Sequence, residues 1–80
     1  MNIKILFFAK IRELLDIENT VIELNEQCTL NDLINILHAE YPILKNIYVV
    51  YSINQEYVYN NNIILNKNDI IALIPPISGG

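Results

Sequence analysis

The chain has 80 residues, of which 52% are hydrophobic, and nine acidic against five basic side chains give a net charge of −4. This length allows one domain, and the hydrophobic content favours a folded core over a disordered chain. A negative net charge with a single arginine argues against nucleic-acid binding, and no apolar run approaches the ~18 residues of a membrane span.

The N-terminal residues 2–8 predict a strand. Alternation places Ile3, Ile5 and Phe7 on the face toward the core and leaves the large apolar side chain of Phe8 on the outer face. No signal-peptide pattern precedes this strand, and the single cysteine cannot form an internal disulfide. We therefore expect a cytoplasmic protein.

A short helical turn and a second strand follow. Ile11, Leu14 and Leu15 have the i, i+3, i+4 spacing of one helical face. Residues 19–24 are rich in β-branched side chains and predict a strand. We expect this strand to lie antiparallel to the first.

The main helix is predicted to begin after Thr29. Thr29 and Asp32 have the spacing of a capping box, with aspartate in place of the usual glutamate. Pro42 ends the helix, because the residue before a proline disfavours the helical backbone. One continuous apolar stripe along this segment predicts packing on a sheet, and it is formed by Leu30, Leu33, Ile34, Leu37 and Tyr41.

Three further strands are predicted over residues 47–53, 56–59 and 70–74. A tight turn at Asn54 and Gln55 joins the first two. The only two glycines are Gly79 and Gly80, whereas twelve asparagines are present, so we expect asparagine to occupy the left-handed turn positions.

This order of elements predicts an α+β fold with one helix across a mixed sheet of four to five strands. A right-handed crossover places the last strand beside the first, in the middle of the sheet. We expect residues 1–74 to form a single domain and residues 75–80 to form a projecting C-terminal tail.

The sequence contains no recognisable catalytic set. His38 is the only histidine, at the border of the helical stripe, and we interpret it as a boundary residue without a positioned partner. Cys28 precedes the helix cap, and we interpret it as a passive, buried residue. Histidine and cysteine are too sparse for a metal site, and no internal glycine exists for a phosphate loop.

The C-terminal residues are the remaining candidates for a chemical role. Pro75 and Pro76 predict a stiff stem, because proline fixes φ. Gly79 and Gly80 have no side chains, so they can enter a channel that any Cβ would block. A terminal carboxylate can attack the α-phosphate of ATP and form an acyl-adenylate, which a sulfur nucleophile can open. The working group is therefore predicted to be the Gly80 carboxylate.

Four segments resemble the small sulfur-carrier subunits of molybdopterin synthases, which belong to the ubiquitin-like β-grasp family. These are residues 5–14, with Phe-Ala-x-x-Arg-Glu, the Thr-Leu-x-x-Leu of 29–33, the Asn-Gln-Glu of 54–56, and 69–80, which end in Ala-Leu-Ile-Pro-Pro-Ile-Ser-Gly-Gly. The family typically has glycine where Asn68 stands, and an acidic residue is common at the position of Ile70. The resemblance covers essentially the whole chain and implies the ubiquitin-like β-grasp fold.

The resemblance also implies a reaction cycle. A ubiquitin-activating-like adenylyltransferase would adenylate Gly80 with ATP, and a sulfur donor protein would convert it to a thiocarboxylate. The tail would then deliver sulfur to cyclic pyranopterin monophosphate in the large, catalytic synthase subunit, within a heterotetramer of two small and two large subunits. The chain itself would bind no cofactor and have no active site of its own.

The family further implies contact residues. An apolar patch for partner docking would fall on Phe8, Tyr57 and Ile74, with Arg12 as a further docking residue. The tail residues of the site would be Pro75, Pro76, Ser78 and Gly79. Alternation does not place Tyr57. Three alternatives remain open: a ubiquitin-like protein modifier, a sulfur carrier for thiamine thiazole synthesis or tRNA thiolation, and a binding module with an inert tail.

Overall fold

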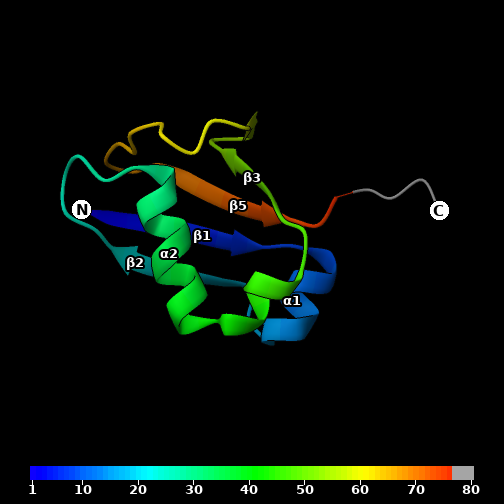
Figure 1. Ribbon diagram of the computed structural model, residues 1–80. Coiled ribbons are helices and arrows are strands. Elements are labelled where there is room, and N and C mark those ends of the chain that lie inside the picture. The colour runs from blue at the N-terminus through cyan, green and yellow to red at the C-terminus, as the bar shows by residue number, and fades with distance from the viewer. Residues whose placement is uncertain (77–80) are drawn as a thin grey trace.

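The computed structural model describes residues 1–76, and residues 77–80 lie outside its described part. Within residues 1–76, five strands form one sheet, accompanied by two α-helices and a short 3₁₀ helix (Figure 1). The strands are β1 (Asn2–Phe7), β2 (Asn19–Glu23), β3 (Val50–Ile53), β4 (Glu56–Val58) and β5 (Ile70–Ile74). The helices are α1 (Ala9–Leu15), α2 (Leu30–Glu40) and the 3₁₀ helix η1 (Pro42–Asn46). The predicted α+β class with one main helix is confirmed.

The strand order across the sheet is β2-β1-β5-β3-β4, so the last strand in the sequence lies in the centre. β5 runs parallel to β1 and antiparallel to β3, and β1 runs antiparallel to β2. Both predicted pairings are therefore confirmed. β5 has a partner strand on both edges, and its Ile71 and Leu73, whose side chains belong to the core, are 0% exposed.

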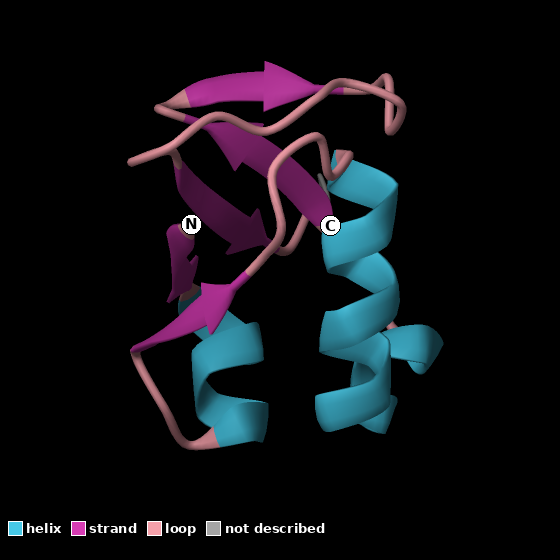
Figure 2. Cartoon of the chain, turned by 90° about the vertical axis from the view of Figure 1, so that its left-hand side faces the viewer, coloured by secondary structure: helices cyan, strands magenta, loops and turns pink. Residues whose placement is uncertain are grey.

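Helix α2 begins at the predicted capping box. Thr29 Oγ1 accepts a hydrogen bond from the Asp32 N–H at 3.2 Å, and the Asp32 carboxylate accepts one from the Thr29 N–H at 2.9 Å. At the other end, the Tyr41 ring meets Phe7 of β1 edge to face, with centroids 5.7 Å apart. The helix lies along one side of the strands (Figure 2). It buries four of the five residues of the predicted stripe, Leu30, Leu33, Ile34 and Leu37, and Tyr41 is partly buried.

β3 is shorter than the predicted strand 47–53, because it begins at Val50. Its partner limits it: Val50 pairs with Ile74, and the next residue of the partner strand is Pro75, which has no N–H for a ladder bond. The preceding chain forms η1 instead, a 3₁₀ helix with Pro42 at its start. Ile47 and Val49 still pack against the core, so their apolar character reflects burial rather than strand pairing.

The expectation that asparagine replaces glycine in the turns is right at only two positions. Six non-glycine residues of the described chain have positive φ: Ala9, Asp16, Gln27, Asn54, Gln55 and Asn68. A left-handed residue costs only about 1–2 kcal/mol, so several side-chain types are tolerated there. The asparagine run works differently, since the Asn60 side chain accepts a hydrogen bond from the Asn62 N–H at 3.0 Å and closes a local turn.

Candidate functional site

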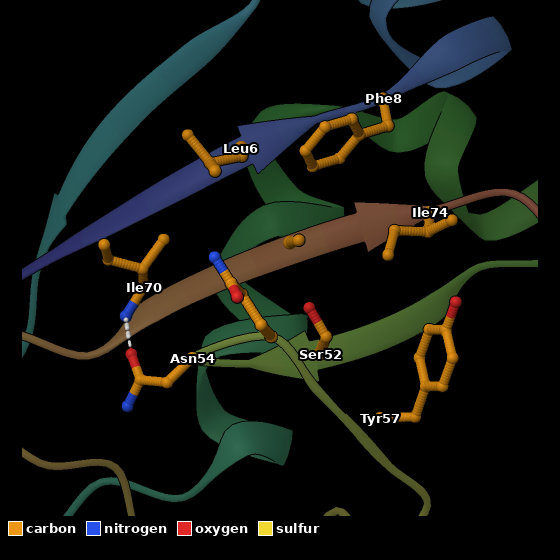
Figure 3. Close-up of a pocket in the computed structure, with 9 residues that line it drawn as sticks. Leu6, Phe8, Ser52, Asn54, Tyr57, Ile70 and Ile74 are labelled. Carbon is orange, nitrogen blue, oxygen red and sulfur yellow. Dashed lines mark hydrogen bonds between the residues drawn. The ribbon is translucent and has the colours of Figure 1, made fainter.

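The sheet face opposite α2 carries a row of four side chains from four strands. The pairing register places Leu6 of β1 beside Ala72 of β5, and Ala72 beside Ser52 of β3. It also places Ser52 beside Tyr57 of β4. Since paired residues point to the same face, the two small side chains lie low between the two large ones. A groove results, with Ala72 and Ser52 as its floor. Figure 3 shows Ser52 on this face, with Leu6 on one side of it and Tyr57 on the other.

The groove has a volume of about 520 Å³ and is mainly apolar. Phe8 and Ile74 lie at one end, and Ile70 lies at the other, two residues before Ala72 on the same strand. Phe8 and Ile70 are each 42% exposed, and Tyr57 is 60% exposed. None of the lining residues carries a formal charge; they are Leu6, Phe8, Ser52, Asn54, Gln55, Tyr57, Ile70, Ala72 and Ile74. Such a surface suits an uncharged, apolar partner segment.

Hydrogen bonds among Asn54, Asn66, Asp69 and Ile70, here called the clamp, hold one edge of this groove in place. The Asn54 side chain donates to Asp69 Oδ1 at 2.9 Å and accepts from the Ile70 N–H at 2.9 Å. The Asn54 N–H donates to the Ile70 carbonyl at 2.8 Å, and the other Asp69 oxygen accepts from the Asn66 N–H at 2.7 Å. Asp69 is only 8% exposed, so its carboxylate depends on these donors. The clamp ties the β3–β4 turn to the start of β5.

Three of the four residues predicted for docking lie together. Phe8, Tyr57 and Ile74 all line the groove, and the outward position predicted for Phe8 from alternation is confirmed. Arg12 lies apart from them: it is exposed on α1 and borders a separate hollow with Glu13, Asp16, Ile17 and Glu18. A docking role for these residues stays a prediction.

A second hollow begins where the groove ends. It has a volume of about 180 Å³ and is lined by Val50, Tyr57, Tyr59, Ile74, Pro75 and Pro76. Tyr57 and Ile74 therefore border both hollows. The groove thus continues to the predicted stem of the tail, whereas Ser78, Gly79 and Gly80 lie outside the described residues.

The other candidates occupy unremarkable surroundings. His38 is half-buried on α2, and Cys28 is partly buried against the core with a free thiol. The described residues contain no group of three histidine, cysteine or carboxylate side chains that could hold a metal ion. None of their helices is long and apolar enough to cross a bilayer. Burial raises the pKa of Tyr51 from 10.0 to about 12, and this residue belongs to the core side rather than the groove.

Sequence reasoning missed the floor and the clamp. Ser52 interrupts an apolar strand, and this single polar residue among Val50, Tyr51 and Ile53 was the available signal. The Asn54–Asp69 contact joins residues 15 positions apart, and no local pattern indicates it.

Comparisons with known proteins agree on one family. The model of the ThiS family matches residues 5–80. A molybdopterin synthase sulfur carrier subunit from Chlamydomonas reinhardtii is 37% identical over 83 residues and covers the full length of both chains. A protein of the same name from Dictyostelium discoideum is 40% identical over 81 residues, which are 96% of this chain and 94% of the relative.

Solved structures give the same fold. The chain is similar to one in the complex of subunits 1 and 2 of the molybdopterin-converting factor from Helicobacter pylori, with 29% identity, a TM-score of 0.74 and full coverage of both chains. SAMP1 from Haloferax volcanii is 20% identical, with a TM-score of 0.86 and full coverage of both chains. At that identity the second likeness shows the fold alone. The predicted ubiquitin-like β-grasp is confirmed.

Proposed function

The chain belongs to the ThiS family, and we propose that it is the sulfur carrier subunit of a molybdopterin synthase. The observation that carries this proposal is full-length similarity to curated sulfur carrier subunits, at 37% identity over both complete chains in the Chlamydomonas reinhardtii protein. The product of such a synthase is molybdopterin, the organic part of the molybdenum cofactor.

The proposed function implies a protein partner, the large subunit of the synthase. Support comes from the Helicobacter pylori structure, in which subunits 1 and 2 of the molybdopterin-converting factor form a complex. The uncharged groove of Phe8, Tyr57 and Ile74 is the surface proposed to dock it. Arg12 lies outside the groove and would contact the partner separately, beyond the apolar surface. The assembly would be a cytoplasmic heterotetramer of two small and two large subunits.

The reacting group is the Gly80 carboxylate. In an adenylyltransferase it attacks the α-phosphate of ATP, so that pyrophosphate leaves and a glycyl adenylate forms. Sulfur that a donor protein supplies at the oxidation level of sulfide then attacks the glycyl carbonyl, displaces AMP and leaves a thiocarboxylate. Gly79 and Gly80 have no Cβ, which lets the end of the chain enter a narrow active site. The carrier supplies sulfur, and the catalytic groups belong to its partners.

The arrangement of β5 supports this cycle. Ile74 ends the strand inside the groove, and Pro75 and Pro76 follow directly. A partner seated in the groove therefore meets the chain at the point where the tail starts. Proline fixes φ at about −65°, so the first two tail residues have restricted freedom. Ser78 follows this stem in the sequence and precedes the two glycines, and it would contact the partner as part of the tail.

Intact-mass analysis tests the proposal. The carrier is incubated with its adenylyltransferase, ATP and a sulfur donor, and the expected product has one terminal oxygen replaced by sulfur. Addition of the large subunit and cyclic pyranopterin monophosphate should then yield molybdopterin and return the carrier to its carboxylate form. Conjugation of the carrier to lysines of other proteins would identify a protein modifier instead. An unchanged mass with a competent activating system would contradict the carrier function.

A further inference from the structure

The hydroxyl of Ser52 at the floor of the groove has no partner within the described chain. Ser52 is only 4% exposed, yet none of the side-chain hydrogen bonds among residues 1–76 involves it. No side-chain oxygen or nitrogen of this part of the chain is both sealed from solvent and unbonded. The Ser52 hydroxyl is therefore open to solvent in the groove, where water can reach it in the free carrier.

Ser52 is the buried polar residue among those that line the groove, whereas the side chains of Gln55 and Tyr57 are exposed. Figure 3 shows Ser52 on the same face as Tyr57 and Ile74, which both lie to one side of it. The nearby Asn54 amide already serves Asp69 and the Ile70 N–H. A partner that covers the groove removes the water from Ser52, and an unpaired buried hydroxyl then costs about 1–3 kcal/mol.

We infer that Ser52 is a specificity-determining residue for docking, and that the large subunit inserts an uncharged apolar segment with one hydrogen-bonding group placed over this hydroxyl. The inference rests on the proposed function and deepens it. A serine hydroxyl both donates and accepts a hydrogen bond, so the group on the large subunit is a carbonyl, an amide or a hydroxyl. A charged group is excluded, because no lining residue offers it a countercharge in the closed groove.

In this arrangement the Ser52 hydroxyl contributes to the affinity for the partner and not to the stability of the free domain. A hydroxyl that bonds within its own domain contributes to stability, and its removal lowers the unfolding temperature. A hydroxyl kept for a partner contributes nothing in the free state. Ser52→Ala should therefore leave the stability of the isolated carrier unchanged or slightly higher, while it weakens the complex.

The test measures two quantities on the full-length carrier: thermal unfolding alone, and affinity for the purified large subunit by calorimetry. For Ser52→Ala we expect an unchanged or higher unfolding temperature and a Kd raised about tenfold, which corresponds to one hydrogen bond lost in an apolar site. Ser52→Thr keeps the hydroxyl and should restore affinity to within about threefold, since the groove has room for one methyl group.

Each contrary result has a distinct meaning. Wild-type affinity in Ser52→Ala, or a clear loss of stability in the free variant, overturns the assignment of Ser52. The ratio of the two affinities should also be the same at low and high salt, because the bond is between neutral groups. A ratio that shrinks with salt overturns the uncharged occupant. Failure of the wild-type carrier to bind the large subunit overturns the proposed function itself, and this inference with it.

Discussion

Replacement of Asn54 by alanine should destabilise the domain by about 4 kcal/mol, a large part of the roughly 4–12 kcal/mol expected for a chain of this size. The substitution removes the 2.9 Å bond to Asp69 Oδ1, worth about 2 kcal/mol because its acceptor is a charged group. It also removes the 2.9 Å bond from the Ile70 N–H, worth about 1 kcal/mol. Finally, it places a Cβ without a polar side chain at φ 51°, which costs about 1 kcal/mol.

Urea denaturation followed by circular dichroism measures this loss, with an unchanged slope as evidence of two-state unfolding. Asn54→Gly is the matched control, because it removes the same two side-chain bonds but adopts positive φ freely. It should be about 1 kcal/mol more stable than Asn54→Ala. A loss below about 1 kcal/mol in the alanine variant would show that the clamp does not stabilise the fold, and the reasoning about Asp69 would be wrong.

Three further predictions concern docking, transfer and pH. Phe8→Asp should weaken large-subunit binding by about 2 kcal/mol, or about 30-fold in Kd, whereas Val21→Asp, at a 57% exposed residue outside the groove, should not; equal affinities would refute the docking surface. Gly80→Ala should abolish sulfur transfer in the mass assay with an unchanged unfolding temperature, because the described core ends at Leu73; retained transfer would contradict the requirement for a bare terminus. Because burial raises the pKa of Tyr51 to about 12, the folded state favours its neutral form, and the unfolded chain loses this proton from pH 10 upward. The free energy of unfolding should therefore fall between pH 10 and 12, and Tyr51→Phe should remove part of that fall.

Local patterns predicted the faces of the elements, because each depends on residues close in sequence. Alternation alone placed Phe7 in the core and Phe8 outside, as the period of a strand requires. The capping box fixed the start of α2 at Thr29 for the same reason, since both of its bonds span three residues. The central place of β5 followed from the handedness of crossover connections.

The groove depends on register, which no local pattern contains. Its floor requires Ser52 to face Ala72, residues 20 positions apart that are paired by the β3–β5 ladder. β4 has only three residues, too few for alternation to place Tyr57, and its pairing with Ser52 decides the side. The clamp between Asn54 and Asp69 likewise arises only once the β3–β4 turn meets the start of β5.

The central position of β5 explains how a small carrier domain can present a tail from a defined point. The final residues of β5 are held on both sides: Val50 of β3 pairs with Ile74, and the Phe8 N–H donates to the Leu73 carbonyl at 3.2 Å. An edge strand such as β4 has a partner on one side alone, so its end would fray more readily. Because the same strand supplies the groove floor at Ala72 and ends directly before Pro75, a partner bound in the groove holds the start of the tail at a fixed distance. Under the proposed function, docking in the groove and delivery by the tail would therefore be coupled through the five residues of β5.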